Sequence, residues 1–428
     1  MQDTALPVER AILVGVDTGR SDWPIADSLA ELARLAQTDG AEVVGELTQK
    51  LDAPIPRTFI GKGKAEELKD MVKALDADVV IFDDELTPSQ QSNLEKMLGE
   101  KYKVIDRTAL ILDIFGNHAT TAEGRLQVQL AQLNYLYPRL RGMWSHLVGE
   151  QTRGGIGSRF GQGESQLEVD RRLVRNRISK LKSDLEKLDT RRAVQAKARW
   201  DSGVYRVALA GYTNAGKSTL LNRLTESDVY VRDELFATLD PTTRSLDLAE
   251  GRKITLTDTV GFIQKLPTML VESFKSTLAE VMAADLILLV VDASDEKADM
   301  QVAAVKEVLR QIEAQHIPQL LVYNKCDLLD EDALAALRNA KPDAVFISAA
   351  EGAGIDSLLH RIAAKASEGD ATITALIPYD KGLLIKMVHE RCQVIRESYG
   401  EGGLLVTVRA SARMQDTLAP YAAEEADA

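Results

Sequence analysis

The residues with the clearest chemistry form a glycine-rich turn at 211–218. The sequence there is GYTNAGKS, which matches the pattern G-x-x-x-x-G-K-[ST]. Glycines allow the backbone to approach a ligand closely, so that backbone N–H groups and a helix N-terminus hold phosphate oxygens. We expect Lys217 to reach the β- and γ-phosphates and the Ser218 hydroxyl to bind Mg²⁺. The pattern therefore predicts a site for a nucleoside triphosphate.

Three further motifs follow in the order that a GTPase requires. Residues 258–261 read DTVG, and we expect Asp258 to hold Mg²⁺, largely through water, while the Gly261 N–H contacts the γ-phosphate. Residues 324–327 read NKCD, in which the Asp327 carboxylate can accept both the N1–H and the exocyclic amino group of guanine. Adenine offers no such pair and would leave that carboxylate unpaired, so this motif predicts GTP rather than ATP.

The last motif is the SAA sequence after a short apolar run, which resembles the loop that completes a guanine pocket. The expected GTP-binding residues are Gly211, Tyr212, Thr213, Asn214, Ala215, Gly216, Lys217, Ser218, Thr219, Asp258, Gly261, Asn324, Lys325, Asp327, Ser348, Ala349 and Ala350. Of these we expect Lys217 and Gly261 to be catalytic, together with a threonine of the switch loop.

That threonine should lie between the glycine-rich turn and Asp258, where a loop orders around Mg²⁺ and the γ-phosphate only when the triphosphate is bound. The candidates are Thr238, Thr242 and Thr243. We favour Thr238 as the catalytic residue and Mg²⁺ ligand, because it lies 20 residues before Asp258, a spacing that resembles that of related GTPases. The other two are then interpreted as caps of a turn or a helix.

Phe262 stands where Ras-like GTPases carry the glutamine that orients the attacking water. A phenyl ring cannot hold that water, so we expect slow intrinsic hydrolysis that a bound partner stimulates. Asn214 suggests one contribution, because an asparagine at this place binds K⁺ near the phosphates in several GTPases. The alternative is that Asn214 only stabilises the loop. Arg244 could act as an internal arginine finger, although a solvated surface arginine is the simpler interpretation.

The elements that must position these residues alternate between strands and helices. The pattern predicts an α/β protein with four parts: an N-terminal α/β domain over 1–112, a helical hairpin over 113–200, a P-loop GTPase domain over 201–370 and a small C-terminal α+β domain over 371–428. Thr87 and Pro88 are expected to open a helix as N-cap and first helical residue. In the last part we expect a strand, a helix over KGLLIKMVHERCQVIRE, a glycine-rich turn and a strand.

The hairpin is predicted from large residues that recur at heptad spacing over 126–140 and again over 167–188. Between them lies the expected tip of the hairpin, residues 149–163, which holds six glycines. The alternative is a linker followed by one surface helix.

The chain has 428 residues, 52 Lys and Arg, 65 Asp and Glu and a net charge of −13. Residues 125–200 hold 16 Lys and Arg against 7 Asp and Glu, a local charge of +9, so the rest carries −22. Basic side chains beside glycine amides suit contacts with RNA phosphates and bases. The expected RNA-binding residues are Arg153, Gly154, Gly155, Arg159, Arg171, Arg172 and Arg175. The alternative is a solvated basic helix face.

Two cysteines are too few for a disulfide framework in this chain, which favours a reducing, cytoplasmic compartment. The longest apolar run, 286–291, has six residues, so we expect no stable membrane insertion, while peripheral membrane association stays open. We expect a monomer.

The chain resembles the HflX-type translational GTPases over nearly its whole length. The matching segments are 59–68, 149–172, 211–220, 235–244 and 257–280. The resemblance implies GTP hydrolysis coupled to binding of the large ribosomal subunit, and separation or rescue of stalled ribosomes under stress. It also implies, for some members, ATP binding by the N-terminal domain, although that domain has no P-loop here. The alternatives are a K⁺-assisted GTPase that regulates tRNA modification or ribosome assembly, and an interaction scaffold with a vestigial GTPase.

Overall fold

A computed structural model describes residues 8–99, 101–151, 166–201, 204–225, 235–236, 238, 240–248, 252–267, 270, 275–400 and 402–423. The chain divides into two compact units, which we describe separately. The first unit contains Met1–Leu188, Glu234–Leu239 and Lys265–Lys275. The second unit contains Asp189–Asp233, Asp240–Gln264 and Ser276–Ala428. Two short segments thus belong to the first unit: one contains Thr238 of the expected switch loop, and the other begins four residues after Gly261.

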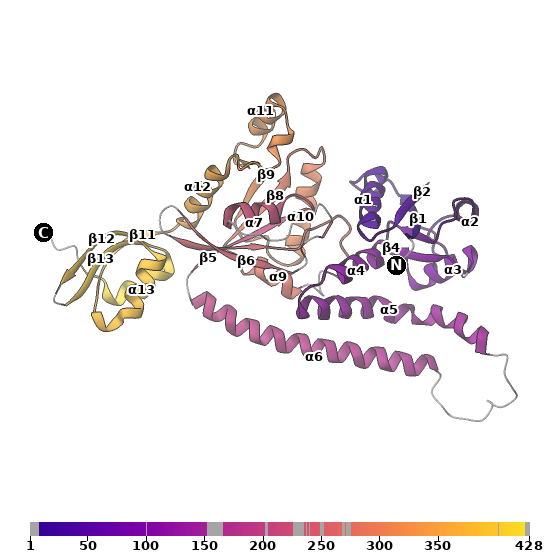
Figure 1. The fold of residues 1–428 in the computed structure, drawn as a ribbon, viewed down its shortest axis with the longest axis horizontal. Coiled ribbons are helices and arrows are strands. Elements are labelled where there is room, and N and C mark those ends of the chain that lie inside the picture. Colours follow the sequence, from indigo (N-terminus) through magenta and orange to yellow (C-terminus); the bar gives the residue numbers. More distant parts are fainter. Residues whose placement is uncertain are drawn as a thin grey trace, which may run out of the picture. The chain divides into compact units, whose positions relative to one another are not determined.

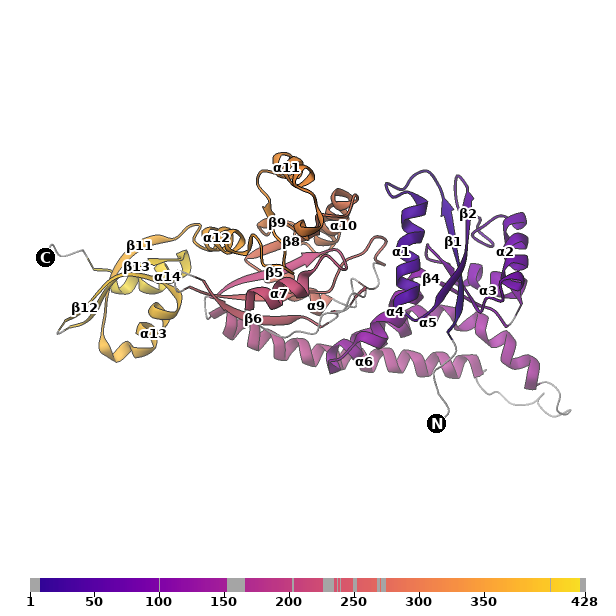
Figure 2. The ribbon, with the colours of Figure 1, turned by 45° about the horizontal axis from the view of Figure 1, so that its top comes forward.

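The first unit is built on a four-stranded parallel sheet in the order β2-β1-β3-β4 (Figure 1). Its strands are β1 (Arg10–Asp17), β2 (Glu42–Lys50), β3 (Val79–Phe82) and β4 (Lys103–Asp106). Its helices are α1 (Ile25–Thr38), α2 (Lys62–Ala74), α3 (Pro88–Leu98) and α4 (Arg107–His118). Figure 2 shows α1 on one face of this sheet and α2 and α3 on the other. Because helices cover both faces, β3 is an uninterrupted buried run.

The start of α3 confirms the cap that the sequence predicts. The Thr87 side chain accepts a hydrogen bond from the Gln90 backbone N–H, and the Gln90 side chain accepts one from the Thr87 N–H. Pro88 occupies the first helical position, where its missing N–H is not needed. This reciprocal capping box fixes the entry of the chain into α3.

Two long helices follow, α5 (Ala122–Gln151) and α6 (Gln166–Asp201), as the heptad pattern predicts. A linker with a single surface helix is therefore wrong. Leu130, Leu140 and Leu181 are buried members of the predicted seam. Residues 152–163 of the expected tip lie outside the described residues.

The second unit holds a six-stranded sheet in the order β10-β9-β8-β5-β7-β6, in which only the pairing of β6 with β7 is antiparallel. Its strands are β5 (Tyr205–Gly211), β6 (Thr242–Asp247), β7 (Lys253–Asp258), β8 (Leu286–Asp292), β9 (Gln319–Asn324) and β10 (Val345–Phe346). Its helices are α7 (Lys217–Thr225), α9 (Lys275–Met282), α10 (Ala298–Gln311), α11 (Glu331–Ala340) and α12 (Ile355–Ala366), with a 3₁₀ turn, η1 (Cys326–Leu328). The expected motifs follow β5, β7, β9 and β10 at the carboxyl edge, where open α/β sheets bind ligands.

One expectation about this sheet is wrong. Thr242 and Thr243 do not cap a turn or a helix, because they begin the edge strand β6. The hydroxyls of Thr243 and Thr257 lie 2.9 Å apart across the pair of strands. This cross-strand pair suits threonine, whose branched side chain favours a sheet.

The second unit ends in a three-stranded antiparallel sheet of order β11-β13-β12. Its strands are β11 (Ala371–Ile377), β12 (Gln393–Gly400) and β13 (Gly403–Ala410). Its helical elements are η2 (Tyr379–Lys381), α13 (Gly382–Arg391), α14 (Ala412–Leu418) and η3 (Ala419–Tyr421). The helix expected to continue to residue 397 is wrong, because α13 ends at Arg391 and QVIRESYG forms β12. Pairing with β13 overrides the local helical pattern there.

None of the helices within the described residues is long and apolar enough to span a membrane.

Candidate nucleotide site

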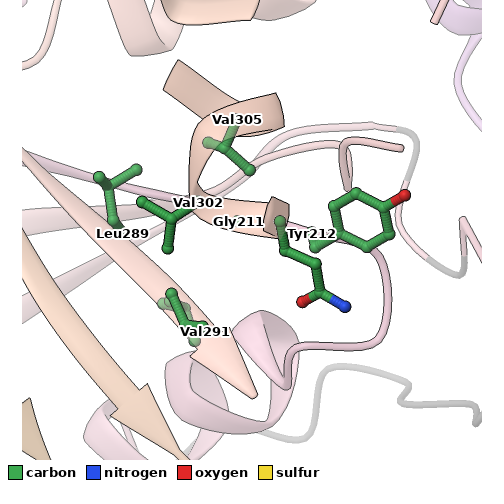
Figure 3. A pocket seen from close by; sticks show the side chains of 8 residues that line it. Gly211, Tyr212, Leu289, Val291, Val302 and Val305 are labelled. Atoms are coloured by element: carbon green, nitrogen blue, oxygen red, sulfur yellow. The ribbon is translucent and has the colours of Figure 1, made fainter. Parts of the chain in front are cut away.

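The glycine-rich turn connects β5 to α7 and needs glycine at two places. At Gly216 the φ angle is +88°, and an added Cβ would lie 2.3 Å from the Asn324 side-chain nitrogen. At Gly211 an added Cβ would lie 2.2 Å from the Val290 carbonyl oxygen of β8. Figure 3 shows Gly211 and Tyr212 beside the side chains of β8 and α10, around a cavity of about 10 Å³. Close packing of β5 on β8 therefore excludes a side chain at 211, independently of any phosphate.

Lys217 and Ser218 lie at the start of α7, where the sequence predicts phosphate and metal contacts. Lys217 is 6% exposed, and its ammonium donates to the carbonyl oxygens of Gly211 and Tyr212 at 3.2 and 2.9 Å. Burial lowers the pKa of Lys217 to about 8, against the opposing effect of Asp258. The structure thus holds a buried cation on backbone carbonyls, at the place where phosphate oxygens are expected.

Ser218 and Asp258 come together as the sequence predicts. The Ser218 hydroxyl donates to Asp258 Oδ2 at 2.6 Å, and Asp258 is fully buried. Adjacent hydroxyl and carboxylate oxygens are hard ligands of the kind that Mg²⁺ prefers. These two side chains therefore fit a magnesium ion.

The residues after Asp258 lie directly against the glycine-rich turn. The Thr213 N–H donates to the Phe262 carbonyl at 2.8 Å, and the Phe262 N–H donates to the Gly211 carbonyl at 3.1 Å. An added Cβ at Gly261 would lie 2.9 Å from Thr213 Cα and 3.2 Å from Lys217 Nζ. Gly261 thus lies beside the lysine, and its contact with the γ-phosphate stays a prediction.

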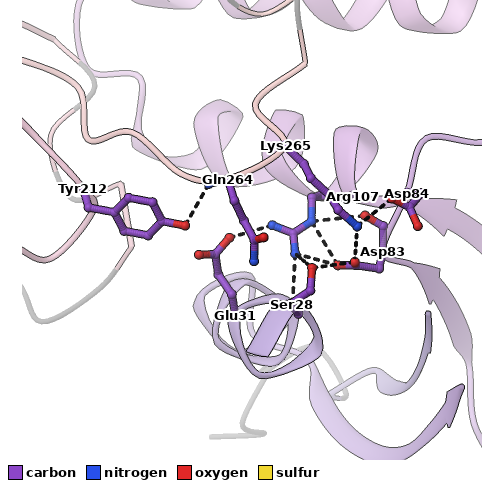
Figure 4. Close-up of polar contacts among 8 residues, drawn as sticks. All are labelled: Ser28, Glu31, Asp83, Asp84, Arg107, Tyr212, Gln264 and Lys265. Carbon is purple, nitrogen blue, oxygen red and sulfur yellow. Dashed lines mark hydrogen bonds and ion pairs between the residues drawn. The ribbon is translucent and has the colours of Figure 1, made fainter. Parts of the chain in front are cut away.

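The Phe262 side chain is fully buried. An apolar ring in that position offers no hydrogen bond to an attacking water, as the sequence predicts. Two residues later, the Gln264 N–H donates to the Tyr212 hydroxyl at 2.8 Å (Figure 4). This contact ties the segment after Gly261 to the glycine-rich turn a second time.

Asn324 links the expected base-binding loops to the glycine-rich turn. Its side-chain amide donates to the Ala215 carbonyl and accepts from the Ala349 N–H, both at 2.9 Å. Lys325 pairs with Asp292 at 2.7 Å, and Asp327 is exposed in η1. The structure therefore brings the NKCD and SAA motifs together at the same edge.

Three family models match successive parts of the chain. They are described as GTP-binding GTPase N-terminal (residues 26–116), GTP-binding GTPase Middle Region (residues 118–199) and 50S ribosome-binding GTPase (residues 206–325). GTPase HflX of Caldanaerobacter subterraneus subsp. tengcongensis is 46% identical over 418 residues, which cover 98% of this chain and 95% of that protein. The chain belongs to the HflX GTPase family.

GTPase HflX of Escherichia coli K12 is similar too, at 45% identity over 379 residues, which cover 88% of each chain. A solved structure with some similarity is a GTP-binding protein from the hyperthermophilic archaeon Sulfolobus solfataricus in complex with GDP. It is 23% identical, with a TM-score of 0.41, over 84% of this chain and 99% of that chain. As a member of the HflX family, the protein is a GTPase with a P-loop nucleotide-binding domain.

Two predicted ligands of this HflX-family site stay predictions. Thr238 is half-buried and belongs to the first unit, whereas Ser218 and Asp258 belong to the second. Asn214 has a φ of +60°, a left-handed conformation that asparagine tolerates better than most residues. That conformation suits the loop whether or not K⁺ binds.

The expected RNA-binding residues of the hairpin fall into two groups. Arg153, Gly154, Gly155 and Arg159 lie outside the described residues. Arg171 and Arg175 lie 5.6 and 5.8 Å from the centre of the Tyr137 ring of α5, and Arg175 donates to the Tyr137 hydroxyl at 2.7 Å. Arg172 is exposed. Two of the predicted arginines therefore also join α6 to α5.

Sequence reasoning missed an ion cluster at the carboxyl edge of the first sheet (Figure 4). Arg107, which follows β4, pairs with Asp83 at 2.6 Å and with Glu31 at 2.7 Å. The Ser28 hydroxyl donates to Asp83 at 2.7 Å. Burial opposes the charge on Arg107, but the two carboxylates outweigh it and raise the pKa of that guanidinium. No motif marks these residues, because they lie far apart in the sequence.

Lys265 completes this cluster. It directly follows Gln264, yet its ammonium pairs with Asp83 at 2.5 Å and with Asp84 at 2.6 Å. Its φ of +52° is a conformation that costs a non-glycine residue of the order of 1 kcal/mol. Two ion pairs offset that cost. The chain thus passes from the D-x-x-G motif of the second unit into a charged cluster of the first.

Proposed function

We propose that this HflX-family GTPase is a GTP-dependent factor that binds the large ribosomal subunit and separates or rescues stalled ribosomes under stress. The observation that carries the proposal is the match of residues 206–325 to a 50S ribosome-binding GTPase, together with the GYTNAGKS, DTVG and NKCD motifs at one edge of one sheet. The local charge of +9 over 125–200 supports an RNA partner. The proposed compartment is the cytoplasm.

At the site, Lys217 binds the β- and γ-phosphates and Asp327 binds the guanine edge. Ser218, Asp258 and Thr238 hold Mg²⁺, which neutralises charge on the phosphates when it is bound. Gly261 donates its N–H to the γ-phosphate, beside Lys217, and the chain continues from Gly261 to Lys265. Because Phe262 cannot hold the attacking water, the ribosome supplies the missing contact and accelerates hydrolysis. K⁺ at Asn214 would add positive charge beside the phosphates.

The experiment is co-sedimentation with purified large subunits in a non-hydrolysable GTP analogue and in GDP. We expect binding with the analogue and weak binding with GDP, followed by subunit separation when whole ribosomes are offered. Equal binding in both nucleotides would contradict a nucleotide-controlled switch. Turnover raised many-fold by ribosomes would exclude a vestigial GTPase in a scaffold.

The tip is tested by the double variant Arg153→Ala with Arg159→Ala. We expect it to bind GDP as the parent does but to sediment poorly with large subunits. A matched control is Arg310→Ala with Arg361→Ala, which removes two exposed arginines on α10 and α12. If the tip variant and the control sediment alike, the tip does not bind ribosomal RNA.

A second candidate is a K⁺-assisted GTPase that regulates tRNA modification or ribosome assembly, which rests on the presence of an asparagine at position 214 of the P-loop. It predicts binding to tRNA or to immature subunits in preference to mature ones. Binding of ATP by the N-terminal unit stays a prediction from the family resemblance.

A further inference from the structure

Arg223 of α7 contacts the loop that follows β10. Its Nε donates to the Ala349 carbonyl at 3.0 Å, and its Nη2 donates to the Ala350 carbonyl. A guanidinium is a planar fork whose donors hold two acceptors in fixed directions, which a single ammonium cannot do. Arg223 therefore fixes two successive peptide groups of this loop. It lies on the same helix as Lys217, six residues later in the sequence.

The amides of residues 348–352 have distinct partners. The Ser348 N–H donates to Ala353 O, and the Gly352 N–H donates to Ser348 O. The Ala349 N–H donates to Asn324 Oδ1, and the Glu351 N–H donates to Ser348 Oγ. Among the residues that the structure describes, none accepts a hydrogen bond from the remaining amide, Ala350 N–H. Ala350 is exposed, so this donor is available to a ligand.

The carbonyl that Arg223 holds and the available donor belong to the same peptide group. The bond between Ala349 and Ala350 is trans, because the structure has no cis peptide in its described part. In a trans peptide the C=O and the N–H point in opposite directions. By fixing the Ala349 carbonyl, Arg223 therefore also fixes the direction of the Ala350 N–H. A hydrogen bond at the carbonyl polarises the peptide and strengthens that donor.

We propose that Arg223 is a positioning residue for guanine: it aims the Ala350 N–H at the 6-oxo group of the base. The inference rests on the proposed assignment of Ser348, Ala349 and Ala350 to the base pocket. Asn324 of the NKCD motif is hydrogen-bonded to this loop, so the Ala350 donor and the Asp327 acceptor can read different positions of one base. Adenine carries an amino group in place of the 6-oxo group, and two donors would then face each other. Arg223 thus supports rejection of adenine without touching the nucleotide.

The test uses two analogues that each change one position of guanine. In 6-thio-GDP a sulfur, a weaker acceptor, replaces the 6-oxo group, whereas IDP lacks the 2-amino group that Asp327 is proposed to bind. Dissociation constants for GDP, IDP and 6-thio-GDP are measured by calorimetry on the full chain. The variants are Arg223→Met, Arg223→Lys and, as a control, Arg361→Met, which changes an exposed arginine of α12.

We expect the parent and the control to bind both analogues about three- to tenfold more weakly than GDP, as for one lost hydrogen bond. Arg223→Met should weaken GDP binding by a similar factor. In this variant 6-thio-GDP should bind almost as tightly as GDP (most of the 6-thio penalty is lost), while IDP should still bind about three- to tenfold more weakly than GDP (the IDP penalty stays). Arg223→Lys should restore part of the 6-thio penalty.

An unchanged 6-thio penalty in Arg223→Met would overturn the inference while leaving the base-pocket assignment intact. Equal loss of both penalties together with a lower melting temperature would overturn it as well, since Arg223 would then only support the loop. If the parent itself shows neither penalty, the assignment of the base pocket fails first.

Discussion

Arg107 and Lys217 are both buried cations that follow a parallel strand of a sheet, one in each unit. Arg107 is 2% exposed and Lys217 is 6% exposed. Arg107 contacts two carboxylates, and its pKa is raised, whereas Lys217 donates to backbone carbonyls and burial lowers its pKa to about 8. The first cation is neutralised by the protein itself. The second lacks that neutralisation, which is what a phosphate-binding residue requires.

The comparison explains why two similar edges differ in use. At the first edge the protein supplies both signs of charge, including Lys265 from the chain after the D-x-x-G motif. At the second edge the Ser218 hydroxyl donates to Asp258, and we propose that these two side chains hold Mg²⁺ while Lys217 binds the phosphates. The same position in an α/β sheet is therefore structural in one unit and ligand-binding in the other.

The largest expected effect is on stability, from Arg107→Met. It leaves Glu31 buried without Arg107, and Asp83 paired with Lys265 but no longer with Arg107, which should lower the free energy of unfolding by about 3–5 kcal/mol. Urea denaturation of the full chain measures this. The triple variant that adds Asp83→Asn and Glu31→Gln should recover most of the lost unfolding free energy. If Arg107→Met alone is as stable as the parent, Arg107 does not neutralise these carboxylates in the way that the comparison requires.

The next effect is on binding, from Lys217→Met. We expect GDP affinity to fall roughly 100-fold, because a charge-assisted contact to phosphate is lost. The free energy of unfolding without nucleotide should stay the same or rise, since an uncompensated buried charge is removed. Lys306→Met, on an exposed position of α10, is the control for both measurements. A marked loss of stability in Lys217→Met would show that this cation is structural too.

A smaller effect is expected from Lys265→Ala. Its side chain is 29% exposed, so loss of the pairs with Asp83 and Asp84 should cost about 1–2 kcal/mol of unfolding free energy. Lys265→Arg should keep most of this unfolding free energy, because it preserves the positive charge. Denaturation at low and high salt checks the assignment, because the loss should shrink when salt screens the Asp84 pair. A loss that salt does not change would point to packing instead.

The smallest effect concerns Asp39, a carboxylate of the first unit that lies near Asp113 rather than near a cation. Burial, and then Asp113, raise the pKa of Asp39 from 3.8 to about 6. The folded state therefore binds more protons than the unfolded state between these values, and this group makes the fold less stable as the pH rises through 6. Asp39→Asn should raise the free energy of unfolding by about 1 kcal/mol or less at pH 7, because the Asp39 carboxylate is half-exposed. The gain should vanish below about pH 4; a gain that persists there would come from another source.

The sequence predicts the residues of the nucleotide site better than it predicts the residues that hold the surrounding segments in place. Lys217, Ser218 and Asp258 are found from motifs because short segments after strands carry them. Arg223, Lys265 and Arg107 are not, because each acts on a partner far away in the chain and leaves no periodic signal. The pattern predicts that the helix continues through residues 393–397, although pairing with β13 makes them part of a strand. Thr242 and Thr243 were misread for the same reason.

The most direct test of the comparison is GDP affinity as a function of pH, between about pH 7 and 9. If the free Lys217 titrates with a pKa of about 8 and bound phosphate keeps it protonated, the dissociation constant should rise above pH 8, approaching tenfold per pH unit. In Lys217→Met it should stay flat over the same range. If the GDP affinity of the parent does not change up to pH 9, Lys217 is not a buried cation that must be protonated to bind the phosphates.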